Sequence, residues 1–154
     1  MKRISTLRAR VILLCLTGLL LFAPLSLADG YNQGVTSEVL KKAATTANGQ
    51  KIAFPVTDKA EVTAAMVSIA PGAETGWHRH PMPVYAYVLS GSLSVSLEDG
   101  GLLSYSPGDV IIEVVDTLHN GKNIGSDPVK LVVFYLGSEG VPLAVKEAPA
   151  EKVK

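Results

Sequence analysis

The feature that most constrains the fold is a series of short apolar segments separated by glycine- and proline-rich turns, from residue 51 onward. The clearest segment, residues 92–97, reads Ser-Leu-Ser-Val-Ser-Leu, so every second side chain is apolar. This period of two is typical of a strand with one buried face and one exposed face. Turn sequences such as Asp99-Gly100-Gly101 and Pro107-Gly108-Asp109 separate neighbouring segments and favour hairpins.

The same pattern predicts strands along most of the remaining chain. The expected strands are 52–56, 61–69, 84–97 with an interruption at Gly91, 102–105, 110–115 and 129–136. The last of these is apolar and β-branched almost throughout, which predicts a strand buried on both faces. Residues 29–49 can be read as a helix, but their threonine pair favours an extended segment. Short strands without a convincing long helix indicate an all-β sandwich or small barrel.

Composition excludes several classes of protein. The 154 residues are 47% hydrophobic, which provides enough apolar surface for a core and excludes global disorder. Lysine and arginine together number 14 and acidic residues also number 14, so there is no basic surplus for binding nucleic acid. The one cysteine excludes a disulfide scaffold and a thiolate metal cluster.

Residues 1–28 have the pattern of a secretory signal peptide. A basic start precedes the apolar run 11–22, and the small residues Ser26 and Ala28 follow Pro24, as a cleavage site requires. The run is short for a membrane anchor, which would span roughly 30 Å of hydrocarbon. Cleavage after Ala28 would leave 10 basic and 14 acidic residues, a net charge of −4, and no cysteine. We therefore expect export to a bacterial periplasm, with no membrane attachment after cleavage.

The three histidines of the chain are His78, His80 and His119. Residues two apart on a strand point to the same face, so the imidazoles of His78 and His80 can reach one point. Adjacent strands lie about 4.8 Å apart, and His119 follows the predicted strand 110–115. A neighbouring strand can therefore supply the third nitrogen ligand to a metal ion.

The spacing around these histidines resembles the two motifs of the cupin superfamily. The first motif is matched by Gly72, His78, His80 and Gly91. The second motif is matched by Gly101, the turn Pro107-Gly108, His119 and Asn123. The resemblance is to small single-domain cupins of the quercetin dioxygenase-like, cupin 2 type. It implies an antiparallel jelly-roll β-barrel with a divalent metal ion, Fe(II) in the first place and Mn, Ni or Zn as alternatives.

The chain departs from the first motif where the family has a glutamate ligand. That position is Val84, or Tyr85 with one more residue, and neither replaces a carboxylate. Glu113 is the one charged residue in the run 110–115, and burying it is costly unless it is paired, protonated or metal-bound. Glu113 can point to solvent, or it can face the metal as a fourth ligand or a general base.

Several other side chains are candidates for the lining of a pocket, although ordinary core packing is the favoured interpretation of each of them. They are Trp77, Met82, Tyr85, Tyr87 and Phe134. Tyr85 and Tyr87 share a strand face, so we take Tyr85 with Glu113 as candidate catalytic residues. Arg79 is expected to form a surface ion pair, and Asn123 to fix a turn through its side chain.

Three functions are compatible with this sequence. A metal-dependent enzyme would leave open metal positions for substrate and O₂, which suits a dioxygenase acting on a small enol, diketone or phenol, or an isomerase. A binding protein would sequester a metal ion or a small molecule without catalysis, and a vestigial site would be purely structural. The expected organisation is signal peptide 1–28, N-terminal extension 29–50, cupin domain 51–140 and C-terminal tail 141–154. The resemblance also implies a homodimer formed by paired edge strands.

Overall fold

The structure is a computed structural model that describes residues 32–147. The predicted signal peptide, residues 1–28, lies outside the described residues. Residues 32–38 belong to a different compact unit from residues 39–147 and contain no helix or strand. The extended interpretation of residues 29–49 is confirmed for their described part, 32–49, which holds no helix.

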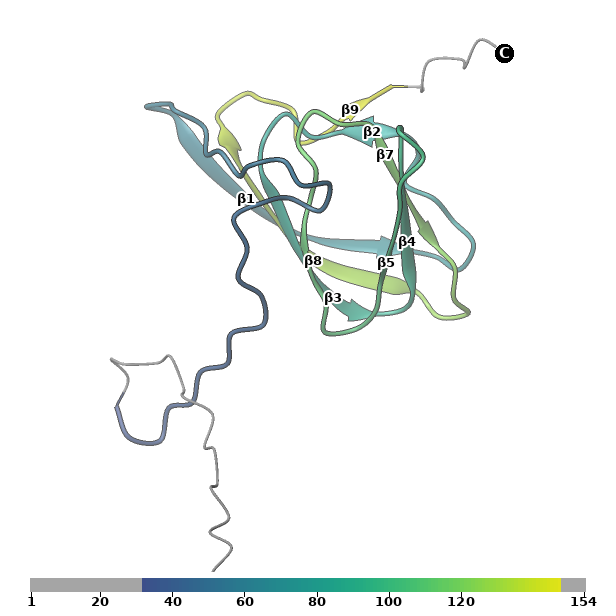
Figure 1. Cartoon of the computed structure of the whole chain (residues 1–154), viewed down its shortest axis with the longest axis horizontal. Helices are drawn as coiled ribbons and strands as arrows, with labels where there is room; N and C mark the ends of the chain where they lie inside the picture. The colour runs from purple at the N-terminus through teal and green to yellow at the C-terminus, as the bar shows by residue number, and fades with distance from the viewer. Residues whose placement is uncertain (1–31, 148–154) are drawn as a thin grey trace, which may run out of the picture. The chain divides into compact units, whose positions relative to one another are not determined.

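Residues 39–147 form nine strands in two antiparallel sheets (Figure 1). The four-stranded sheet has the order β1-β8-β3-β6, and the five-stranded sheet has the order β5-β4-β7-β2-β9. The strands are β1 (Ala60–Ile69), β2 (His78–Arg79), β3 (Val84–Ser90), β4 (Leu93–Leu97), β5 (Leu102–Tyr105), β6 (Val110–Ile112), β7 (His119–Asn123), β8 (Val129–Ser138) and β9 (Val145–Lys146). This confirms the all-β jelly-roll class, because two antiparallel sheets enclose one core.

The core lies between the two sheets. Alternate residues of β3 and β8 point inward, and the innermost are Val84, Val88 and Val129, each at most 1% exposed. β8 pairs with β1 on one side and with β3 on the other, which places it at the centre of the four-stranded sheet. Burial of apolar surface stabilises the folded state by about 25 cal/mol per Å², which favours this inward alternation.

Three expected strands differ from those observed. Residues 52–57 form no strand, because Phe54 and Val56 are solvent-exposed and Pro55 lacks the N–H that pairing requires. β6 ends at Ile112, short of the expected end at 115. β8 is expected to be buried on both faces but is buried on one only, since Lys130 and Phe134 on its other face are exposed. Burial of both faces needs a second covering layer, and an apolar sequence does not by itself supply one.

Asn123 fixes the turn that follows β7, as predicted. Its amide nitrogen donates to the carbonyl oxygens of Ile69 (2.9 Å) and Asp127 (2.8 Å), and its Oδ1 accepts from the backbone N–H of Gly125 (2.9 Å). Asn123 is 1% exposed, so these bonds satisfy groups that water does not reach.

The ends of the described unit also join the barrel. β9, from the segment expected as a C-terminal tail, pairs with β2. Before β1, the backbone N–H of Ala47 donates to the carbonyl of Ile112 (2.9 Å), and the Gln50 side chain bonds the backbone of Val115 (3.1 Å). Within residues 32–147, no helix has the length and apolarity needed to cross a membrane.

Candidate metal centre

The three histidines meet on the inner side of the five-stranded sheet. His78 in β2 stands directly opposite His119 in β7 in the antiparallel register, and His80 follows β2 two residues later. Their ring centroids are 4.4 to 5.1 Å apart. One nitrogen from each ring lies within 4.8 Å of the other two. The predicted convergence of His78, His80 and His119 is therefore observed, and the three are positioned to bind a metal ion.

Backbone carbonyls orient all three imidazoles in the same way. The Nδ1 of His78 lies 2.8 Å from the Gly76 oxygen. The Nδ1 of His80 lies 2.6 Å from the Leu143 oxygen, and that of His119 lies 2.9 Å from the Thr117 oxygen. A carbonyl only accepts, so each Nδ1 carries a proton, and in the neutral ring each Nε2 presents a lone pair. Such bonds fix the tautomer and ring orientation of metal-binding histidines.

The donor set fits a divalent metal ion. His80 and His119 are each 4% exposed, and among the described residues the Nε2 of His119 is a buried nitrogen without a hydrogen-bond partner. A buried nitrogen left unpaired costs about 1–3 kcal/mol, and a bound cation would remove that cost. Neutral imidazole nitrogens are ligands that Zn, Cu, Fe and Ni accept.

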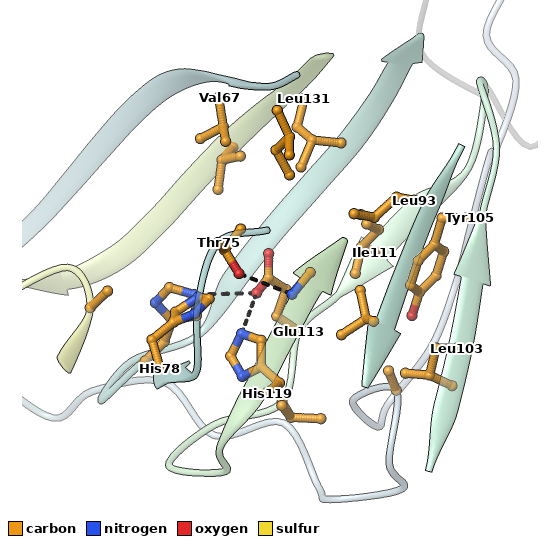
Figure 2. A pocket seen from close by; sticks show the side chains of 18 of the residues that line it. Val67, Thr75, His78, Leu93, Leu103, Tyr105, Ile111, Glu113, His119 and Leu131 are labelled. Atoms are coloured by element: carbon orange, nitrogen blue, oxygen red, sulfur yellow. Dashed lines mark hydrogen bonds and ion pairs between the residues drawn. The ribbon is translucent and has the colours of Figure 1, made fainter. Parts of the chain in front are cut away.

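Glu113 points inward toward the histidines (Figure 2). Its Oε2 lies 3.3 Å from the Nε2 of His80 and 3.3 Å from the Nε2 of His119. It follows β6 with the same parity as the buried Ile111, and its backbone N–H donates to the carbonyl of Val84 (2.9 Å). The alternative in which Glu113 faces solvent is not observed, because its side chain is 17% exposed.

Burial and charge act on these groups in opposite directions. Burial alone would raise the pKa of Glu113, but the adjacent imidazoles of His119 and His80 outweigh it and hold the pKa at about 2. Burial lowers the pKa of His78, which favours the neutral imidazole that binds metals. For His80, burial is outweighed by the adjacent Glu113 carboxylate, and its pKa is raised. The site therefore holds a carboxylate next to three rings at neutral pH.

The histidines and Glu113 line one end of a cavity of about 210 Å³. Aliphatic side chains from both sheets form most of the remaining wall, with Tyr105, Tyr135, Thr75 and Lys146 as its other polar residues (Figure 2 labels Tyr105 and Thr75). The aliphatic lining residues include Val67, Leu93, Leu103, Ile111 and Leu131. Burial raises the pKa of both phenols, with a further contribution from Glu113, so both remain hydrogen-bond donors at neutral pH.

The structure does not bring Tyr85 to this cavity, which corrects its placement near the metal. Val84 and Ala86 are the buried residues of that part of β3, so Tyr85 between them points to the outer face of the sheet. The other aromatic and methionine candidates also lie outside the cavity lining, namely Trp77, Met82, Tyr87 and Phe134. Arg79 forms the expected surface ion pairs, to Asp116 (3.1 Å) and Glu147 (3.2 Å).

Sequence reasoning missed Tyr105 and Tyr135 as cavity residues. In β8, Tyr135 has the parity of the buried Val133, and its ring meets His80 edge-on with the centroids 5.6 Å apart. That parity is the signal that would have found it. In β5, Tyr105 stands opposite the buried Leu93, a pairing that is known only once the strands are aligned.

Known proteins similar to this chain share the fold. A family model described as a cupin domain matches residues 65–135. The (R)-mandelonitrile lyase of Granulicella tundricola is 38% identical over 58 residues, which cover 38% of this chain and 44% of that protein. The DMSP lyase DddQ from Ruegeria pomeroyi superposes with a TM-score of 0.51 at 20% identity, covering 62% of this chain and 47% of that chain.

A third similar protein is an oxalate decarboxylase from Lactobacillus farciminis, whose structure superposes with a TM-score of 0.48 and 22% identity over 55% of this chain and 26% of that one. The chain thus spans less than half the length of each of these three proteins. The matched segment 65–135 contains all three histidines and Glu113. With two antiparallel sheets and an inward-facing histidine triad around this matched segment, the chain contains a small cupin domain.

Proposed function

We propose that this protein is a metal-dependent enzyme that acts on a small molecule with an apolar body and one or two oxygen donors. The observation that supports this most directly is that one nitrogen from each of three imidazoles converges at one end of a mostly aliphatic cavity. Ligand sites of this kind combine an apolar wall with a few convergent polar groups. The finer proposal is a dioxygenase acting on an enol, a diketone or a phenol.

Different residues of the cavity would bind the substrate and the metal ion. The aliphatic wall binds the apolar body of the substrate and excludes water, while Tyr105 and Tyr135 can donate hydrogen bonds to its oxygens. His78, His80 and His119 would hold the ion. A divalent ion held there supplies Lewis acidity toward a substrate oxygen and, as Fe(II), the redox capacity that reaction with O₂ requires.

The test separates binding from turnover. The purified protein is analysed for metal content and then loaded anaerobically with Fe(II), Mn(II), Ni(II) or Zn(II). O₂ uptake is measured with a panel of diketones, enols and phenols, with His119→Ala as the matched inactive control. We expect stoichiometric metal and O₂ uptake only in the loaded wild type. Metal binding without turnover of any compound would instead favour the non-enzymatic binding protein.

A second candidate function is a lyase, because the chain is 38% identical over 58 residues to a mandelonitrile lyase. Mandelonitrile is a small aromatic cyanohydrin, and its phenyl ring suits an aliphatic cavity wall. Loaded protein is incubated with mandelonitrile without O₂, and the release of benzaldehyde is followed by absorbance. Aldehyde release that needs the metal and His119, with no O₂ uptake in the first assay, would favour the lyase over the dioxygenase.

We also propose that the protein is exported to a bacterial periplasm. The support is the basic start, apolar run and small-residue cleavage site of residues 1–28. Expression of the full chain in a bacterium, followed by cell fractionation and N-terminal sequencing, tests this. We expect periplasmic protein that begins at Asp29, and cytoplasmic protein that begins at Met1 would contradict it.

A further inference from the structure

We infer that Glu113 is the fourth protein ligand of the metal, supplied by the sheet opposite the three histidines. This inference rests on the metal site of the proposed function but not on any particular reaction. The position that would carry the glutamate of the first motif is Val84 or Tyr85. Val84 is packed in the apolar core and Tyr85 points outward, so neither provides an oxygen donor.

The distances around Glu113 match those between two ligands of one ion. With bonds of about 2.1 Å, two ligands are about 3.0 Å apart at a right angle and about 3.4 Å apart at a tetrahedral angle. The Oε2 of Glu113 lies 3.3 Å from the Nε2 of His80 and 3.3 Å from the Nε2 of His119. One carboxylate oxygen is thus equidistant from two ring nitrogens, at the spacing of neighbouring ligands.

The same distances fit a direct ion pair poorly. A charge-assisted hydrogen bond between a protonated imidazole and a carboxylate is about 2.7–2.9 Å long. Both contacts of Glu113 are longer than this, and the Nε2 of His119 has no partner of acceptable hydrogen-bond geometry. Each Nδ1 donates to a carbonyl, so in its neutral form each ring would turn an Nε2 lone pair toward the carboxylate. A cation held among these atoms would replace that repulsion with attraction to both groups.

The backbone explains how a residue of the other sheet reaches the site. Glu113 follows β6, in the four-stranded sheet, while β2 and β7 belong to the five-stranded sheet. Between Glu113 and His119 the chain crosses from one sheet to the other, and Asp116 takes a left-handed conformation there (φ 48°), which aspartate tolerates. The Asp116 N–H donates to the His80 carbonyl (2.9 Å), which ties the crossing to the histidine segment. A metal bound by Glu113 and the histidines therefore links the two sheets.

The test compares Glu113→Gln with Glu74→Gln as a matched control. The Glu74 carboxylate bonds Lys122 (2.7 Å) and Asn120 (2.8 Å) and does not line the cavity. The affinity of the full chain for Co(II) and Mn(II) is measured by competition with a chelator, and the visible spectrum of the Co(II) form is recorded. We expect Glu113→Gln to weaken binding by about 100-fold or more, since even residues that only orient ligands contribute about 10–100-fold. It should also change the Co(II) spectrum, whereas Glu74→Gln should do neither.

A wild-type measurement keeps the inference testable if Glu113→Gln does not fold. A crystal structure of the Mn(II)-loaded wild type should place a Glu113 oxygen about 2.0–2.2 Å from the ion, as ligating carboxylates do. Water between Glu113 and the ion would overturn the inference, as would unchanged affinity and spectrum in Glu113→Gln. Loss of activity with unchanged affinity would identify Glu113 as a base instead. Failure of every substrate assay would leave the ligand assignment intact, because none of these readouts uses turnover.

Discussion

At the residue scale, Arg79 and His80 are neighbours with opposite surroundings. The His80 ring is buried and points into the cavity, whereas the Arg79 side chain is 37% exposed and pairs with Asp116 and Glu147. Strand alternation places their side chains on opposite faces. Arg79 is therefore positioned at the surface, and His80, the next residue, is positioned for metal binding.

This contrast gives a matched pair of substitutions. His80→Ala should abolish stoichiometric metal binding, because it removes one of three converging nitrogens. Arg79→Ala should retain it and lose at most about 1 kcal/mol of stability, since exposed ion pairs contribute little. Metal content after dialysis and urea unfolding check both effects. Retained metal in His80→Ala, or its loss in Arg79→Ala with the fold intact, would contradict the assignment.

At the scale of elements, the turn between β3 and β4 is set by Gly91. Its φ is +83°, a region that disfavours side chains. A Cβ at this position would lie 2.7 Å from the Cα of Val129 and 2.8 Å from its Cγ2. Val129 is fully buried in the core, so nothing there is free to move aside.

We therefore expect Gly91→Ala to destabilise the fold much more than Gly100→Ala. Gly100 has a similar φ of +94° in the β4–β5 turn, with no atom within 4 Å of the added carbon. Both variants carry the cost of a left-handed residue, about 1–2 kcal/mol, and Gly91→Ala adds about 1–3 kcal/mol of overpacking. Urea unfolding of the two variants measures the difference. Equal losses of stability in the two variants would contradict this expectation, because they would mean that Val129 can move aside at no energetic cost.

At the scale of the whole molecule, metal binding should stabilise the barrel. An ion that binds only the folded state adds about 2.7 kcal/mol when its free concentration is 100 times the dissociation constant. Chelation with EDTA should therefore lower the unfolding temperature of loaded protein by several degrees, and re-addition of metal should restore it. Glu74→Gln should respond as the wild type does. An unchanged unfolding temperature after verified metal removal would contradict this.

The outer face of the four-stranded sheet is the surface on which we expect a second copy to bind. The register places Val62, Met66 and Phe134 on this outer face, where they are 65%, 62% and 44% exposed. Tyr85 and Tyr87 of β3 lie beside them, opposite Phe134 and Val132. An exposed apolar face of this kind marks an interaction site, and in a two-fold dimer the same face of each copy meets the other. We therefore propose that the homodimer contact is this sheet face and not the paired edge strands that the family resemblance implies.

Phe134→Glu tests this homodimer, with Leu102→Glu as its control. Leu102 is 68% exposed on β5 in the other sheet, so the same substitution there should leave the dimer intact. Light scattering after size-exclusion chromatography should give the mass of a dimer for the wild type and Leu102→Glu, and of a monomer for Phe134→Glu. A monomeric wild type, or dissociation by Leu102→Glu alone, would contradict the proposal.

Local patterns in the sequence predicted most strands and the three histidines, because turn residues and the period of two act over a few neighbours. The tertiary structure decided which face of each strand became the inside. Residues 84–88 are apolar on both faces, so alternation alone did not exclude Tyr85 from the inside of the barrel, and packing between the sheets placed Val84 and Ala86 in the core instead. Glu113 meets His80 and His119 only because the chain crosses between sheets after β6. Parity along one strand carries no information about a neighbour on another sheet.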